Sequence, residues 1–251
     1  MKKKAILVLL IVMLGSTWLF SQTLDQILAK NYAARGGLEK LKAIKTIYTE
    51  GKTVIAIQNM EIPAKIWMKK PNKMRMEMVV MEKTLVMGFD GQKAWMIVPF
   101  LGTDDAQEMP AEQSKEFSEQ ADSMDPLVDY KEKGDQLEFI GKEDMEGSPV
   151  YKLKLTKKNG KITFFYLDTD SCIELKTTSF VKAGEQELQV DTLLGDYKEV
   201  DGIMIPFSME IKGGPSSMKI VLNNIKFNVE ADDSMFVMPP KKAQPTETEK
   251  K

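Results

Sequence analysis

The sequence predicts a mostly β fold of the α+β class, built on one large antiparallel sheet that is curved or barrel-like. Strand-like alternation recurs in about ten or eleven segments, with turn signals about every 8–14 residues. Helix-like spacing is confined to residues 23–44 and 103–130. Cys172 is the only cysteine, so a hydrophobic core rather than a disulfide must hold the fold. We expect one domain over residues 22–240.

The N-terminal residues have the pattern of a secretory signal peptide. Three lysines at 2–4 precede an apolar run at 5–14, and a less apolar stretch ends at Ser21. An uncleaved anchor is the alternative, but about 16 apolar residues fall short of the ~20 that span a bilayer. We therefore predict a signal peptide over 1–21, cleaved near Ser21.

The remainder is expected to be a soluble periplasmic protein. No cysteine stands near the cleavage point, so we expect no lipid anchor. Residues 241–251 are polar and contain proline, which is typical of a disordered tail.

The first helical stretch covers residues 23–35. Thr23 is placed to cap it, and Gly36-Gly37 to end it. A second short helical stretch follows at 38–44. The apolar residues at helical spacing in the first stretch are Leu24, Ile27, Leu28 and Tyr32.

From Thr46 the period changes to that of strands, and the first half of the chain is predicted to form an antiparallel meander. Glu82-Lys83 is a candidate tight turn, and Asp90-Gly91 is a turn signal that leads into a strand through Trp95 and Ile97. The predicted strand segments are 46–57, 61–70, 72–80, 83–91 and the stretch ending at Pro99.

Residues 103–130 interrupt the strand pattern. Pro110 suits a helix start, and we expect one or two short helices that pack over the sheet. Their thin apolar stripe consists of Phe117, Ala121, Met124, and Leu127 or Val128.

The second half returns to strands. Tyr151, Leu153 and Leu155 alternate with polar residues. The segments 158–160 and 168–171 are predicted turns. No domain boundary and no internal repeat is evident in this half.

The composition excludes several kinds of chemistry. The chain has 18 Met and no His, so it has no Ser-His-Asp triad, no Cys-His pair and no His metal site. Cys172 lacks a histidine to activate it and is expected to be a small buried hydrophobe. The net charge of −2 does not suit nucleic-acid binding. We expect no enzyme activity, metal or cofactor, although a hydrolase with paired carboxylates remains an alternative.

Two blocks of sequence resemble the LolA/LolB-like superfamily, which comprises periplasmic carriers and outer-membrane receptors of bacterial lipoproteins. The first block, "WMKKPNKMRMEM" followed by "MGFDGQKAWMIVPF", matches a basic–Pro–Asn step and a "DG…W…P" hairpin. The second, "LNNIKFNVEADDSMFVMPP", matches an Asn-containing strand followed by "D…F…PP". The matching residues are Lys70, Pro71, Asn72, Asp90, Gly91, Trp95 and Pro99, then Asn228, Asp232, Asp233, Phe236 and Pro239.

This resemblance implies an unclosed barrel of about eleven antiparallel strands, with short helices as a lid over a concave apolar face that holds acyl chains. It also implies a latch, because an Arg before the Pro commonly bonds to the lid backbone. Lys70 stands at that position and lacks the planar fork of arginine. RseB, a periplasmic envelope-stress sensor, shares the fold, so a sensor or protein-interaction module is the alternative function.

The methionines fit a ligand face as well as a packed core. Met has three rotatable bonds and a polarizable sulfur, so it adapts to acyl chains of varied shape, whereas ordinary β cores prefer Val, Ile and Phe. The lid residues are expected to be Leu24, Ile27, Leu28, Phe117 and Met124. The predicted cavity residues are Ile66, Met68, Met74, Met76, Met78, Val80, Leu85, Met87, Phe89, Trp95 and Ile97.

The predicted function is therefore a monomeric periplasmic carrier for acyl chains of lipids or lipoproteins in outer-membrane transport. Its expected partners are those acyl chains and inner- or outer-membrane sorting proteins.

Overall fold

A computed structural model describes residues 22–55, 58, 60–102, 104–183, 186–213 and 217–241. The predicted signal peptide and all of the predicted tail except Lys241 lie outside the described residues.

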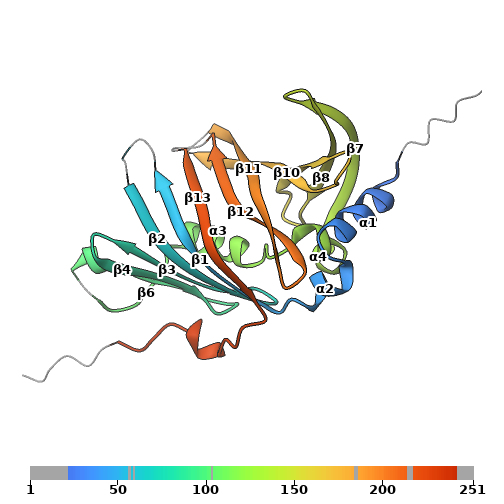
Figure 1. The fold of residues 1–251 in the computed structure, drawn as a ribbon. Coiled ribbons are helices and arrows are strands. Elements are labelled where there is room, and N and C mark those ends of the chain that lie inside the picture. The colour runs from blue at the N-terminus through green and yellow to red at the C-terminus, as the bar shows by residue number, and fades with distance from the viewer. Residues whose placement is uncertain are drawn as a thin grey trace, which may run out of the picture.

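Among the described residues, thirteen strands form one antiparallel sheet, which is the main element of the fold (Figure 1). The strand order is β6-β5-β4-β3-β2-β1-β13-β12-β11-β10-β9-β8-β7, so β6 and β7 are the two edges and the barrel is not closed. The predicted count of about eleven was low. The two-residue β6 falls inside the stretch predicted to be helical, since it is too short to show alternation. The strands are β1 Thr46–Ile55, β2 Met60–Lys69, β3 Lys73–Val80, β4 Lys83–Phe89, β5 Ala94–Ile97, β6 Gln107–Glu108, β7 Gln136–Met145, β8 Ser148–Thr156, β9 Ile162–Asp168, β10 Glu174–Ala183, β11 Gln186–Val200, β12 Ile203–Lys212 and β13 Met218–Phe227.

Short turns fix the register of the first meander. Met81 and Glu82 both have positive φ, 47° and 63°, as a tight two-residue hairpin turn requires. The turn at Met81-Glu82 lies one residue earlier than the predicted turn at Glu82-Lys83. In the next hairpin, Asp90 Oδ1 accepts hydrogen bonds from the backbone N–H of Gln92 and Lys93, both at 2.8 Å.

Four α-helices of the described residues lie on one side of the sheet or at its end: α1 Leu24–Ala34, α2 Leu38–Ala43, α3 Ala111–Ala121 and α4 Pro126–Lys133. Thr23 and Gln26 form the capping box that begins α1. The predicted helix start at Pro110 is correct, because Pro110 is the N-cap of α3. The 3-10 turn η2, Pro99–Leu101, follows β5, and the 3-10 turn η3, Asp233–Met235, follows β13.

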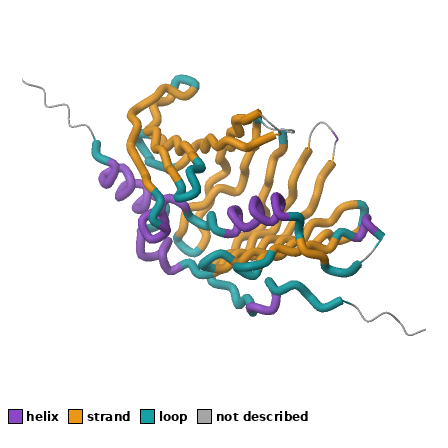
Figure 2. The backbone as a smooth tube through the Cα atoms, turned by 180° about the vertical axis from the view of Figure 1, so that it is seen from behind, coloured by secondary structure: helices purple, strands orange, loops and turns teal. Residues whose placement is uncertain are grey.

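The helices cover separate parts of the concave side of the sheet and leave the rest of it without a helix (Figure 2). α3 crosses in front of the sheet, and α1 and α4 pack with β7, β8 and β9 at one end. α1, α4 and β7–β9 together form the largest hydrophobic cluster among the described residues. α2 and α4 form another cluster with Ile203 of β12. The predicted packing of the helices over the sheet is confirmed.

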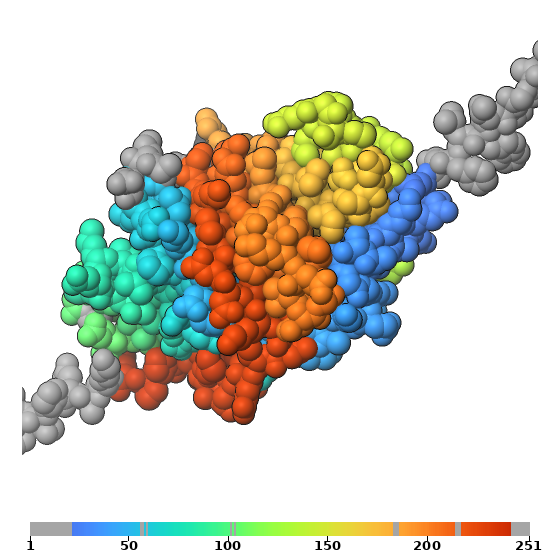
Figure 3. Space-filling view, viewed as in Figure 1, coloured from blue at the N-terminus to red at the C-terminus, as the bar shows by residue number. Residues whose placement is uncertain are grey.

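The C-terminal residues 228–240 cross the convex side, and we call them the C-terminal strap. In Figure 3 the strap lies in red along the lower edge of this side. Lys69 and Lys73 each contact Asp233 at 2.7 Å, and their hydrogen bonds lower the pKa of that carboxyl to about 2. The Trp95 indole N–H donates to the Phe236 carbonyl at 2.7 Å.

Candidate functional site

Cross-strand pairing defines which residues share the concave face. Met68 pairs with Met74, Ile66 with Met76, and Met76 in turn with Met87. Directly paired residues point to the same side of a sheet. The alternate methionines of β3, Met74, Met76 and Met78, therefore share the concave face.

One part of this face is packed, and we call it the covered half. Phe117 and Ala121 of α3 are buried against Met74, Phe89 and other residues of β3–β5. Met74 is only 4 % exposed. The partly buried residues packed on the same cluster are Ile66, Met68, Met76, Met87 and Met96.

The rest of the face, the open half, belongs to none of the hydrophobic clusters that the structure describes. Burial changes along single strands: in β13 Ile225 is 4 % exposed, whereas Ile220 is only half-buried. In β12 Ile203 is buried and Met209 is half-buried. The open half is defined here by six half-buried residues, Ile55, Ile62, Met78, Met209, Ile220 and Leu222.

The open half is free of charged side chains where β1, β2, β12 and β13 pair. The residue opposite Ile220 in β1 is Thr53, and the one in β12 is Met209. Charged residues of the same strands alternate onto the convex side, where Lys52 and Glu61 form an ion pair at 2.8 Å. The arrangement suits contact with hydrocarbon rather than catalysis.

Nine of the eleven predicted cavity residues lie on the concave face, in two groups. Ile66, Met68, Met74, Met76, Met87 and Phe89 lie in the covered half, and Met78, Val80 and Leu85 lie beyond it on the same face.

The prediction that Trp95 and Ile97 line the cavity is wrong, because both lie on the convex face of the sheet. The β4–β5 hairpin pairs Phe89 with Ala94 and Met87 with Met96, so the intervening Trp95 points to the convex side. There Trp95 is fully buried with Val86 and Ala106, with Ile97 packed against them.

The predicted lid residues lie in different places. Phe117 covers the methionine strands, but Leu24, Ile27 and Leu28 pack against the β7–β9 end of the sheet. Met124 packs in the cluster of α2, α4 and β12.

Lys70 connects the sheet to α4. Its Nζ lies 2.9 Å from Oδ1 of Asp129, whose side chain is 9 % exposed. The expected latch contact was to lid backbone, whereas this contact is an ion pair between side chains.

A second ionic contact, missed from the sequence, ties α1 to α4 and β10. Arg35 donates to Asp125 through both terminal nitrogens, at 2.6 and 3.3 Å, and lies 3.6 Å from Glu174. Burial raises the pKa of Glu174, and Arg35 only partly offsets this effect. Burial also raises the pKa of Tyr197, whose hydroxyl donates to the Glu174 carbonyl oxygen at 2.7 Å. No sequence pattern predicts this cluster, because its members are far apart in the chain.

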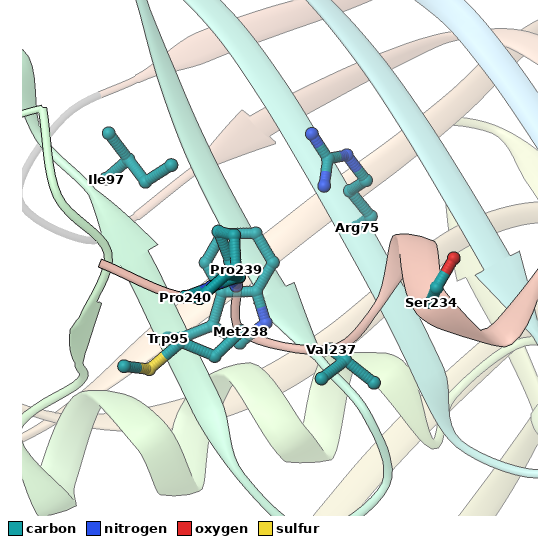
Figure 4. A pocket seen from close by; sticks show the side chains of 8 residues that line it. All are labelled: Arg75, Trp95, Ile97, Ser234, Val237, Met238, Pro239 and Pro240. Atoms are coloured by element: carbon teal, nitrogen blue, oxygen red, sulfur yellow. The ribbon is translucent and has the colours of Figure 1, made fainter. Parts of the chain in front are cut away.

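Two surface cavities lie away from the open half. One, of about 420 Å³, lies on the convex side between the C-terminal strap and β3–β5 (Figure 4). Arg75 lines it but is already bonded to Glu77 and to the Met235 carbonyl. The other, of about 350 Å³, lies between α1, α2 and α4.

Cys172 and the acidic side chains are the residues to consider for nucleophilic and metal chemistry. Cys172 is buried, and burial raises the pKa of its thiol, which favours the unreactive form. No group of three or more Cys, Asp or Glu side chains in the described ranges is placed to hold a metal ion. Within the same ranges, no helix combines the length and apolar character needed to cross a membrane.

Comparison with known proteins identifies the fold. No protein-family model and no curated protein sequence matches this chain. Among solved structures, a LolA superfamily protein from Nitrosomonas europaea aligns with a TM-score of 0.59 at 12 % identity, over 86 % of this chain and 98 % of that one. A DUF1329 family protein from Desulfovibrio piger gives 0.57 at 13 % identity, over 86 % and 98 % of the two chains.

A putative outer membrane lipoprotein-sorting protein domain from Vibrio parahaemolyticus gives a TM-score of 0.55 at 14 % identity, over 84 % of this chain and 94 % of that one. The chain therefore has the LolA-like fold, as the two sequence blocks predicted.

Proposed function

We propose that this protein is a periplasmic carrier that binds acyl chains of lipids or lipoproteins on its concave face and passes them to a membrane partner. It acts by binding and release rather than by catalysis. Transfer to an inner- or outer-membrane sorting protein follows from the need to unload an insoluble chain.

The observation that carries this proposal is the open half. A soluble protein normally covers an apolar sheet face with helices or a second sheet, but α3 covers only part of this one. The names of the similar structures from Vibrio parahaemolyticus and Nitrosomonas europaea agree with such a role.

The energy available is sufficient without any polar contact. Each buried CH₂ contributes about 0.8 kcal/mol, so ten carbons offer roughly 8 kcal/mol before ordering costs. Methionine lining suits chains of different shapes, and Met78 and Met209 both lie on the open half.

Native mass spectrometry tests the proposal. The protein is exported in a bacterial host, purified without detergent and sprayed under native conditions. We expect an adduct with the mass of an acyl lipid, which Met78→Glu removes because a carboxylate does not enter hydrocarbon contact.

Val79→Glu is the matched control, because Val79 is 42 % exposed on the convex side. It should retain the adduct. The absence of any adduct from the wild-type protein, or its persistence in Met78→Glu, would contradict lipid binding at this face.

Export has its own test. We expect the protein in the periplasmic fraction with a new N-terminus near residue 22. A full-length N-terminus in the membrane fraction would instead indicate an uncleaved anchor.

A further inference from the structure

We infer that α3 stays attached to the sheet at both of its ends while the ligand binds. Hydrocarbon reaches the open half at the end of the sheet where β1 ends at Ile55 and β2 begins at Met60. This inference rests on the proposed lipid binding. It assigns the ligand site to the open half and assigns the covered half to the core.

The start of α3 is attached to one wall of the half-barrel. The Met109 N–H, just before the helix, donates to the Ala94 carbonyl of β5 at 3.0 Å. Met109, Phe117 and Ala121 are all buried in the cluster with Met74. Lifting α3 would expose all of these side chains to water.

The end of α3 is attached to the opposite wall. Glu119 accepts hydrogen bonds from Lys161 and from Asn159, the latter at 3.1 Å, and both belong to the β8–β9 turn. Lys157, in the same connection, donates to the Ser123 hydroxyl at 2.8 Å. α3 therefore joins the β5 side of the half-barrel to the β8–β9 side.

The open half needs no such opening. Ile62, Ile220 and Met209 are already half-buried rather than buried, and in Figure 2 the strands continue beyond α3. A ligand can therefore reach them while every contact of α3 is kept.

The ligand class follows from the charges. The paired residues of the open half are apolar or hydroxylic, whereas Lys52, Glu61 and Lys219 of the same strands point to the convex side. A charged head group would lose its hydration on this face without gaining a partner. The site therefore takes uncharged hydrocarbon and leaves the head group in solvent. A second copy of the chain, with its own open half facing this one, is the competing occupant.

Crosslinking α3 in place tests the route. A Cys172→Ala protein with Glu119→Cys and Lys161→Cys is joined by a short bis-maleimide. Binding of cis-parinaric acid is then measured by its fluorescence. We expect the dissociation constant to change by less than about threefold on crosslinking.

Ile220→Asp, without the crosslink, should weaken parinaric acid binding at least tenfold. Val221→Asp should not, since Val221 is the next residue and points to the convex side. Circular dichroism confirms that both variants are folded.

Loss of binding on crosslinking, with recovery when a cleavable linker is cut, would overturn the inference and make α3 the gate, while leaving the proposed function intact. A wild-type dimer that Ile220→Asp dissociates would also overturn it, by showing a second copy on this face. Failure of the uncrosslinked parent to bind any acyl probe would instead refute the proposed function.

Discussion

Lys70 and Asp129 show how one residue pair connects the sheet to its helices. The pair lies where β2 leads into the turn before β3, and the Asp129 carboxylate in α4 is almost fully covered. A buried carboxylate without a partner is costly, so the lysine matters more for the folded state than an exposed lysine would.

We expect Lys70→Met to lower the free energy of unfolding by about 2 kcal/mol, because it leaves Asp129 buried and unpaired. Urea unfolding measures this change. Lys93→Met is the control: its ion pair with Glu108 is 69 % and 64 % exposed, and its loss should cost less than about 1 kcal/mol. Equal effects of the two substitutions would show that Lys70 contributes no more than a surface charge.

Glu174 provides a pH-dependent test. Its pKa in the folded protein is raised above the ordinary value of 4.5 by burial. Between the two pKa values the folded state holds more protons than the unfolded state, so stability falls as pH rises from 4.5 through the folded pKa.

Glu174→Gln removes this titration. We expect the variant to be more stable than wild type at pH 7 and to approach it below pH 4.5, where Glu174 is protonated in both states. Asp125→Asn should instead destabilise at pH 7, because Arg35 loses the negative charge beside it and one of its two acceptor oxygens on residue 125. Thermal unfolding measured at several pH values tests both variants. A Glu174→Gln variant that is less stable than wild type at pH 7 would contradict the claim that burial destabilises the charged form of Glu174.

At the scale of elements, the motif residues hold the C-terminal strap and the turns beneath it. Asn72 donates to the Gly91 carbonyl, Trp95 to the Phe236 carbonyl, and the Asn228 side chain accepts from the Lys45 N–H. The two sequence blocks that resembled the LolA/LolB-like superfamily therefore identify contacts that build the fold. None of these contacts lies on the open half, so the motifs predicted the architecture without indicating the ligand.

Trp95→Phe removes the indole N–H and leaves the buried Phe236 carbonyl without that donor. We expect a loss of about 2 kcal/mol in unfolding free energy and faster proteolysis within the C-terminal strap. Limited proteolysis with mass spectrometry locates the cleavage. Trp67→Phe is the comparison, because Trp67 is only half-buried and packs on Tyr48. Equal proteolysis of the two variants would show that Trp95 does not hold the strap.

Strand alternation was predictable within each strand but not across the turns. The faces of β3 and β4 follow directly from their alternating residues. The face of Trp95 instead depends on how many residues the Asp90–Lys93 connection contains and how they pair, and one residue of difference inverts the following strand. The two-residue β6 has no alternation to detect.

For the whole molecule, the sequence predicted an apolar concave face but not where it is covered. Ile225 and Ile220 are the same residue type in the same strand and on the same face, yet Ile225 is buried and Ile220 is half-buried. The position of α3 over this face depends on contacts between residues far apart in the chain, such as Glu119 with Asn159, which are 40 residues apart. Hydrophobic periodicity carries no information about such contacts.

A ligand on the open half should stabilise the entire fold, because the unfolded chain has no such face. At a free palmitate concentration 100 times the dissociation constant, we expect about 2.7 kcal/mol of stabilisation, or a rise in Tm of about 5–10 °C for a domain of this size. Leu222→Asp should abolish the rise, whereas Asn223→Asp, at an exposed neighbouring position, should keep it. Differential scanning calorimetry at several palmitate concentrations measures the effect, and an equal rise in both variants would place the ligand elsewhere on the protein.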